Sequence, residues 1–219
     1  EIIDDLTPTA DEEIWNGLAA VADSGATAVK PVGRASLGNT GFNYTYSAID
    51  GVKVDVGYSP KTAAGVDDGT TSGTGALRSS SSIAVQYTGI EGANLFVGTG
   101  EAGAATTDSD VDIYGFKYSF GPITVGAQRT DIDYTAASSD LETDMFGISF
   151  AVNDNLSISY GQSETSKEGS TVEQEISGFS IGYSMGGMTV KAHQNKGEKL
   201  ANTAANESEH TEIAISFAF

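Results

Sequence analysis

The strongest constraint on the fold of this chain is a strict alternation of apolar and polar residues that recurs in short runs. In the last nine residues, 211–219, every second position is apolar and large: Ile213, Ile215, Phe217 and Phe219. Successive side chains of a β-strand point to opposite faces of the sheet, so this run predicts a strand with one apolar face. A strand that leaves a membrane at a belt of aromatic residues has this pattern.

The same alternation recurs from about residue 38 to the end of the chain. The apolar faces include Phe42, Tyr44 and Tyr46; Val52, Val54 and Val56; Tyr114, Phe116, Tyr118 and Phe120; Phe146, Ile148 and Phe150; and Phe179, Ile181 and Tyr183. Counting the weaker runs between them, we expect about eleven strands of roughly 8–12 residues each.

The connections between these expected strands alternate between tight turns and long polar segments. Tight turns are expected at Asp50-Gly51, Gly121-Pro122, Asn153-Asp154-Asn155 and Gly186-Gly187. Long loops are expected over 60–80, 101–109, 131–141, 163–172 and 195–208, where polar and small residues accumulate. Short turns at one end and longer loops at the other are typical of an antiparallel transmembrane β-barrel, so the expected fold class is all-β.

The face opposite the apolar one carries mainly Gly, Ser, Thr, Asn and Gln. In a β-sandwich this second face would meet solvent, and in a wide barrel it would line a water-filled lumen. Several aromatic residues lie close to the expected turns or the chain end: Tyr118, Phe120, Phe150, Tyr183 and Phe219. Their position favours an aromatic belt at a membrane interface, and therefore the barrel.

Composition excludes several classes of function. The 219 residues include 11 Lys and Arg against 30 Asp and Glu, a formal net charge of -19, so nucleic acid is not an expected partner. The absence of Cys excludes thiol catalysis and thiolate metal sites. The sequence has no run of about 18 apolar residues, so no membrane-spanning helix is expected. The two histidines, His193 and His210, are expected on a lumen wall or in a loop rather than as catalytic bases.

Residues 1–37 differ from the rest of the chain. Thr9 followed by Glu12 forms a capping box, and apolar residues then follow at helical spacing before Gly25, so we expect a short helix over about 10–23. The segment is strongly acidic. Its composition fits either a solvated surface loop or a charged filter.

The stretch Asn39–Ala48, the acidic helix-bearing segment before it and the terminal Ile213–Phe219 resemble the general diffusion porins of the Gram-negative outer membrane, closest to the Rhodobacter-type alphaproteobacterial family. Porins of that family have sixteen strands, and their third outer loop folds into the lumen as a constriction. The resemblance implies that residues 1–37 are this constriction loop. It also implies that 38–219 are the C-terminal eleven strands of a single barrel domain, whose N-terminal strands are missing here.

The resemblance implies passive diffusion of small hydrophilic solutes and ions, and not an enzyme. The constriction would carry the carboxylates, which favour cations by charge attraction: Asp4, Asp5, Asp11, Glu12 and Glu13. Basic residues of the lumen wall would face them: Arg34, Lys53, Lys117 and Lys191.

The resemblance further implies a homotrimer in the cell outer membrane, in contact with its lipid. Lipopolysaccharide, bridged to the acidic outer loops by divalent cations, is an expected partner. No cofactor is required, although Asp4 and Asp5 are candidate calcium ligands. The alternative is a non-conducting structural or adhesin β-barrel, which would need large apolar residues on the inner face.

Overall fold

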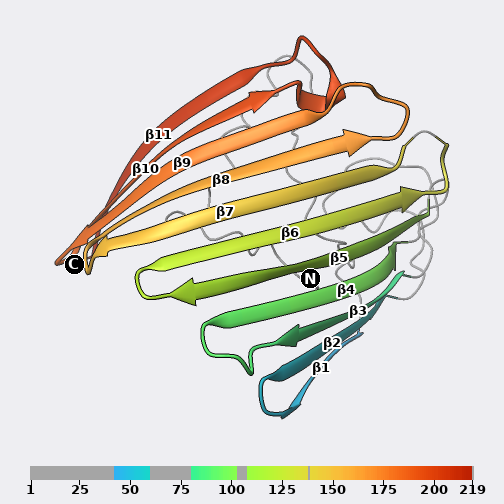
Figure 1. Ribbon diagram of the computed structural model, residues 1–219, viewed down its shortest axis with the longest axis horizontal. Coiled ribbons are helices and arrows are strands. Elements are labelled where there is room, and N and C mark those ends of the chain that lie inside the picture. Colours follow the sequence, from blue (N-terminus) through green and yellow to red (C-terminus); the bar gives the residue numbers. More distant parts are fainter. Residues whose placement is uncertain (1–41, 60–79, 103–107, 138, 219) are drawn as a thin grey trace.

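The structure, a computed structural model, describes residues 42–59, 80–102, 108–137 and 139–218. These residues form one antiparallel sheet in which every strand pairs with its neighbours in sequence (Figure 1). The strands are β1 (Phe42–Ile49), β2 (Val52–Ser59), β3 (Ser80–Tyr87), β4 (Ala93–Ala102), β5 (Ser109–Phe120), β6 (Ile123–Tyr134), β7 (Leu141–Asn153), β8 (Leu156–Lys167), β9 (Gln174–Met185), β10 (Met188–Glu198) and β11 (Ser208–Phe217). The predictions of an all-β fold and of about eleven strands are confirmed. The expected constriction loop and its helix lie outside the described residues.

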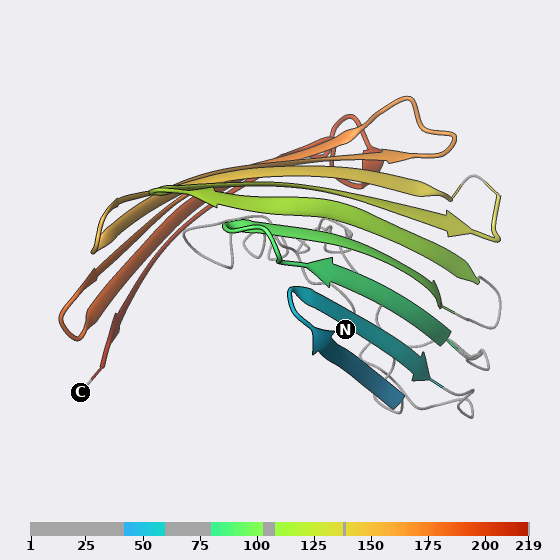
Figure 2. The ribbon, with the colours of Figure 1, turned by 60° about the horizontal axis from the view of Figure 1, so that its bottom comes forward.

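The sheet is strongly curved, with a concave inner face and a convex outer face (Figure 2). β1 and β11 are its two edges, and each pairs with one described strand. Curvature of one hydrogen-bonded sheet over eleven strands in simple up-and-down order is the geometry of a barrel wall.

Tight turns join the strands at one end of the sheet, as expected. In the β1–β2 turn Ile49 pairs with Val52, and Gly51 has φ +71°, a conformation that glycine adopts without steric cost. A Cβ atom at Gly51 would also lie 2.7 Å from the backbone of Gly89 in the neighbouring turn. In the β7–β8 turn, Oδ1 of Asn153 accepts hydrogen bonds from the backbone N–H groups of Asn155 and Leu156 at 2.9 and 3.0 Å.

The side chains of each strand alternate between the two faces. In β7, Phe146, Ile148 and Phe150 lie on the outer face and are exposed, whereas Thr143 and Met145 lie on the inner face and are buried. This is the reverse of a soluble protein, in which large apolar residues are buried and polar residues are exposed.

The strands extend further toward the loop end than the sequence predicts. The segments 131–141, 163–172 and 195–208 were expected to be loops, but β6 continues to Tyr134, β8 to Lys167 and β10 to Glu198. In these extensions the outer face carries polar or charged side chains, such as Asp131 and Asp133, while the inner face is polar in β8 and β10 and carries the buried Ile132 in β6. The apolar outer-face residues that mark a strand in the sequence are absent there although the strand continues.

The inner face is less uniformly polar than the sequence predicts. Two apolar clusters are buried on it: Ala84, Phe96 and Ile113 near the middle of the strands β3–β5, and Met145, Ile176 and Leu200 toward the loop end. Leu200 belongs to η2 (Leu200–Asn202), a 3₁₀ turn between β10 and β11. Within the described ranges, no helix is both long enough and apolar enough to cross a bilayer.

Candidate functional site

The inner face of the sheet is the candidate functional surface, because polar side chains gather there. Many of these side chains are buried, and two pairs of hydroxyls are hydrogen-bonded across neighbouring strands. The hydroxyls of Ser159 and Ser180 are 2.7 Å apart, and those of Thr143 and Thr165 are 3.0 Å apart. Such cross-strand pairs satisfy the polar groups and keep the inner wall rigid.

A row of glycines crosses the inner face in register. Gly126, Gly147, Gly161 and Gly178 lie directly opposite one another on β6, β7, β8 and β9, and all four are buried. The row is continued by Lys117 on β5 and by Asn195 on β10. Adjacent strands are about 4.8 Å apart, so this glycine belt is a recess about 14 Å wide without side chains.

The three lysines predicted for the lumen wall lie on the inner face. Lys53 forms an ion pair with Asp55 at 2.8 Å, and Oδ1 of Asp55 accepts a hydrogen bond from the hydroxyl of Thr45 at 2.6 Å. Lys117 lies opposite Gly126, and Lys191 lies opposite Gly182. Arg34 and the predicted acidic constriction residues lie outside the described residues: Asp4, Asp5, Asp11, Glu12 and Glu13.

The connection 199–207, which we call the mouth loop, folds over the inner face at the loop end of the strands. Leu200 packs on Met145 and Ile176, and Nδ2 of Asn202 donates to the carbonyl oxygens of Thr165 and Val172 at 2.8 and 3.0 Å. The mouth loop thus covers part of β8 and β9 near the end of the wall.

An ion pair between Lys199 and Glu175, with Nζ and Oε1 2.6 Å apart, also holds the mouth loop to β9. The hydrogen bond to the Glu175 carboxylate raises the pKa of Lys199. Gln174 adds a further contact, since its Oε1 accepts a hydrogen bond from the backbone N–H of Ala201 at 2.9 Å. The mouth loop is therefore fixed to the wall by several independent contacts.

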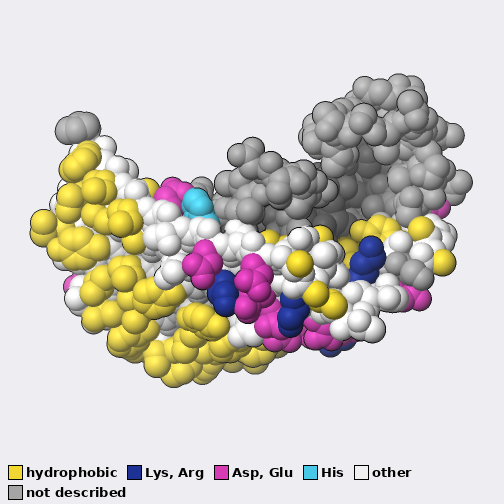
Figure 3. All heavy atoms as spheres, turned by 90° about the horizontal axis from the view of Figure 1, so that it is seen from above, with side chains coloured by type: hydrophobic (Ala, Val, Ile, Leu, Met, Phe, Trp, Pro, Cys, Tyr) yellow, Lys and Arg dark blue, Asp and Glu magenta, His cyan; other side chains and the backbone are white. Residues whose placement is uncertain are grey.

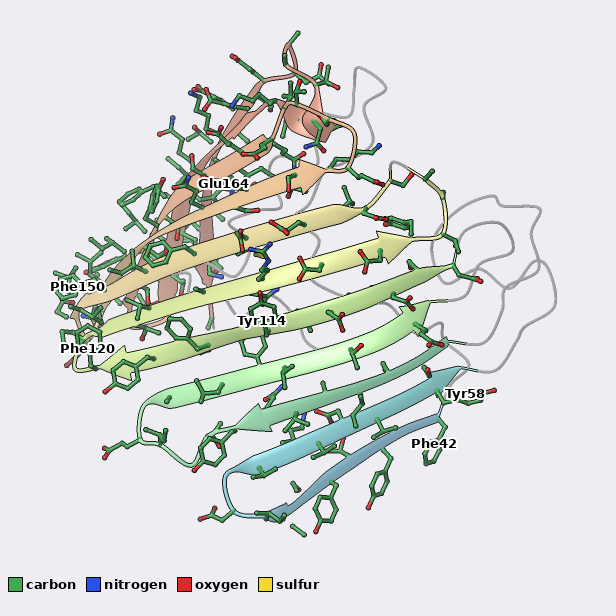
Figure 4. The ribbon with its side chains drawn as sticks, turned by 45° about the vertical axis from the view of Figure 1, so that its right-hand side comes forward. Phe42, Tyr58, Tyr114, Phe120, Phe150 and Glu164 are labelled. Atoms are coloured by element: carbon green, nitrogen blue, oxygen red, sulfur yellow. The ribbon has the colours of Figure 1, made fainter. Side chains whose placement is uncertain are left out.

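The outer face carries a continuous apolar band at the turn end of the strands (Figure 3). On β5 the band runs from Phe120 to Tyr114, seven residues that span about 20 Å along the strand. Figure 4 shows Phe120 and Phe150 at the turn end and Tyr114 further along its strand. The sequence predicted the aromatic belt at the turns; a second set of exposed aromatic residues lies at the other end of the band: Phe42, Tyr58, Tyr114, Tyr160 and Phe179.

Beyond the apolar band the outer face is charged, and we call these residues the collar: Asp112, Arg129, Asp131, Asp133, Glu142, Asp144, Glu164, Glu175, Lys196 and Glu198. Arg129 is at the boundary and forms ion pairs with Asp131, Glu142 and Asp144. The change from apolar to charged side chains along the same strands marks where the outer face leaves a nonpolar environment.

A curved antiparallel sheet with an exposed apolar outer band, aromatic residues at both edges of the band and a polar inner face is the wall of a transmembrane β-barrel. The chain belongs to the Gram-negative porin family, whose family model matches residues 2–218. Its place is therefore the outer membrane. A search of the curated proteins found no match.

Solved structures of outer-membrane proteins have the same fold. OmpT of Vibrio cholerae, an outer-membrane protein, superposes with a TM-score of 0.60 at 13% identity, over 81% of this chain and 64% of that one. OccAB4 of Acinetobacter baumannii superposes with a TM-score of 0.62 at 12% identity, over 82% of this chain and 55% of that one. A protein described as a porin superposes with a TM-score of 0.58 at 16% identity, over 81% of this chain and 60% of that one. The chain thus spans between 55% and 64% of the length of these structures.

Three features of the site were missed by sequence reasoning: the glycine belt, the inward fold of the mouth loop, and the closeness of the two histidines. Each depends on which residues of neighbouring strands lie opposite one another. The interstrand register is not encoded in the spacing along the chain when the connections are long.

Proposed function

We propose that this chain is the C-terminal part of an outer-membrane porin that lets small hydrophilic solutes and ions diffuse passively through a water-filled lumen. The observation that carries the proposal is the opposite polarity of the two faces, seen in β7, β8 and β9. An apolar exterior fits lipid, and a polar inner wall with glycines and small hydroxyl side chains fits water. Transport rather than catalysis is proposed, because the chain belongs to the Gram-negative porin family and its inner wall carries polar and small side chains.

The proposed selectivity filter is the acidic segment 1–37, folded inward as in the Rhodobacter-type porins that the sequence resembles. The glycine belt supports this, because a recess about 14 Å wide on the inner wall offers room for a chain segment. Lys117 at one end of the belt supplies a basic group opposite the proposed carboxylates. A net charge of -19 favours cations over anions.

The proposed whole barrel has sixteen strands, five of which belong to a part of the porin that is not in this chain. Those strands would pair with the free edges of β1 and β11, since an unpaired edge in lipid leaves backbone groups without hydrogen bonds. We further propose a homotrimer, and calcium at Asp4 and Asp5 as an optional ligand of the constriction.

The collar supports a contact with lipopolysaccharide. Its carboxylates nearest the apolar band, including Asp112, Asp144 and Glu164, lie on the outer face. Divalent cations would bridge these carboxylates to phosphate groups of the lipid, since hard oxygen ligands suit Mg²⁺ and Ca²⁺.

The test is planar-bilayer conductance of the purified full-length porin, with the reversal potential measured in a salt gradient. We expect stepwise openings in threes and a cation preference. Neutralising Asp4, Asp5, Asp11, Glu12 and Glu13 together is expected to move the reversal potential toward zero. Glu164→Gln on the outer face is the control, and it should move the reversal potential far less.

Absence of conductance steps from protein that is shown to be folded in the bilayer would overturn the porin proposal. It would favour the non-conducting structural barrel instead. If conductance steps remain and the selectivity is unchanged after neutralisation, the pore proposal would stand, but the acidic segment would not be its filter.

A further inference from the structure

Both histidines of the chain lie together on the inner face, near the edge formed by β11. His193 is on β10 and His210 on β11, and their ring centroids are 5.8 Å apart. Glu212, also on β11, has Oε2 at 3.4 Å from Nε2 of His210.

The interstrand register explains why these residues meet. His193 lies directly opposite Glu212, and Asn195 lies directly opposite His210, so the four residues form a square on one face of a hairpin. One ligand atom from each of His193, His210 and Glu212 can be chosen so that all three lie within 4.8 Å of one another. In a tetrahedral site with metal–ligand bonds of about 2.1 Å, ligand atoms are about 3.4 Å apart. Small side-chain rotations would therefore bring the three atoms into coordination distance.

Asn195 is a second, independent observation at the same place. Its side chain is fully buried, with 0% exposure, and neither its amide oxygen nor its amide nitrogen has a hydrogen-bond partner among the described residues. A buried amide without partners is costly unless another group satisfies it. A metal-bound water, or the metal itself, would supply that partner between the two strands.

The chemistry of the ligands determines which ion fits. Two imidazoles and one carboxylate are the ligands of borderline transition metals such as Zn²⁺, Co²⁺, Ni²⁺ and Cu²⁺, whereas Ca²⁺ and Mg²⁺ prefer oxygen alone. Three protein ligands leave a fourth position for water. Glu212, with a half-exposed side chain, gives the site access to dissolved ions.

We propose that His193, His210 and Glu212 bind one divalent transition-metal ion on the inner wall, with Asn195 as a supporting hydrogen-bond partner. The bound ion joins β10 to β11 and adds positive charge to the wall beside Lys191, which lies two positions from His193 on the same face. This site lies on described strands and uses none of the residues of the proposed acidic filter in 1–37. Metal binding goes beyond the proposed function and does not depend on conduction.

The experiment is titration of the full-length porin, refolded in detergent, with Co²⁺, which gives visible absorption bands that report the ligand field, and with Zn²⁺ by calorimetry. We expect one ion per chain attributable to this site. His193→Ala and His210→Ala are each expected to weaken binding at least about 100-fold, because loss of a direct ligand costs no less than loss of an outer-shell partner. Asn195→Ala, which removes such a partner, is expected to weaken it about tenfold.

Glu209→Gln is the matched control, since Glu209 lies on β11 but on the outer face, opposite Lys196. It should leave the affinity and the Co²⁺ spectrum unchanged. The heat-dependent gel shift and circular dichroism of each variant show whether the barrel has formed. Glu212→Gln provides a second variant that keeps the shape of the side chain; it should weaken binding and shift the Co²⁺ bands.

Equal Zn²⁺ affinity in the parent and in the folded His193→Ala, His210→Ala double variant would overturn the proposal, as would Co²⁺ bands of octahedral hydrated ion alone. Loss of binding in both histidine variants, with normal folding and an unchanged control, would establish the site. If the porin conducts, saturating Zn²⁺ is expected to lower the conductance of the parent and not of the double variant. A negative conductance result can be distinguished from absence of metal binding, because only the conductance measurement requires an open pore.

Discussion

The two faces of the strands β5–β10 are made from the same backbone and the same turns, yet their side chains obey opposite rules. On the outer face of β7, Ile148 is 37% exposed and Phe146 is 47% exposed, while Thr143 on the inner face is 1% exposed. In water such an outer surface would be a large hydrophobic patch. The difference teaches that each face is matched to its own solvent, lipid outside and water inside, and that burial alone does not define the core.

A lysine placed on each face in turn tests this comparison most strongly. Ile148→Lys, in the apolar band between Val125 and Tyr160, is expected to destabilise the folded porin by about 2–4 kcal/mol, because a charge is forced into the bilayer. Ser149→Lys, the adjacent residue on the inner face, is expected to cost under about 1 kcal/mol. The measurement is guanidinium unfolding of the full-length protein in lipid vesicles, and equal costs would contradict the assignment of faces.

The second prediction concerns the inner face at the mouth loop. Asn202→Asp keeps a residue type that tolerates the left-handed backbone (φ 54°) but loses both donated hydrogen bonds to Thr165 and Val172. We expect a local loss of about 1–2 kcal/mol, which corresponds to hydrogen exchange of amides in 199–207 that is about 5–30 times faster. Ala204→Ser, at an exposed position of the same loop, is the control. Unchanged exchange in Asn202→Asp would mean that these bonds do not hold the loop.

The smallest effect is expected at the boundary between band and collar. Arg129→Leu removes the ion pairs with Asp131, Glu142 and Asp144, which are partly exposed, so in water the loss is under about 1 kcal/mol and decreases with salt. If Arg129 instead lay within the bilayer, replacing it by leucine would stabilise the protein by about 2–4 kcal/mol. The sign of the change in vesicle unfolding therefore locates the edge of the apolar band on β6.

The fold could be predicted from the sequence wherever one face of a strand is apolar. Phe146, Ile148 and Phe150 alternate with small or polar residues, and the structure has them on one face. The prediction failed for 131–134, where the outer face carries Asp131 and Asp133 and the apolar residue, Ile132, is buried on the inner face instead. Hydrophobic periodicity depends on the environment of each face and not on the backbone hydrogen bonds. The alternating pattern with an apolar outer face therefore stops at the edge of the membrane, although the strand continues.

The wall features could not be predicted because they depend on the register between strands. The belt glycines Gly126, Gly147, Gly161 and Gly178 are 21, 14 and 17 positions apart, a spacing without any period. His193 and His210 are joined by β10, the mouth loop and β11, so a shift of two residues in that connection would separate them. The sequence shows that these glycines and histidines are present, but only the pairing of the strands shows that they lie side by side.

The height of the collar has an electrical consequence. On β6 the last apolar outer residue is Ala127 and the strand continues to Tyr134, about 24 Å along its axis and about 17 Å above the band at a tilt of about 45°. That height is about two screening lengths at physiological ionic strength. The rim of the wall therefore stands in bulk solution, where the anionic headgroups barely alter the local ion concentrations. Its own carboxylates, rather than the charge of the lipid, set the potential that an approaching ion first meets.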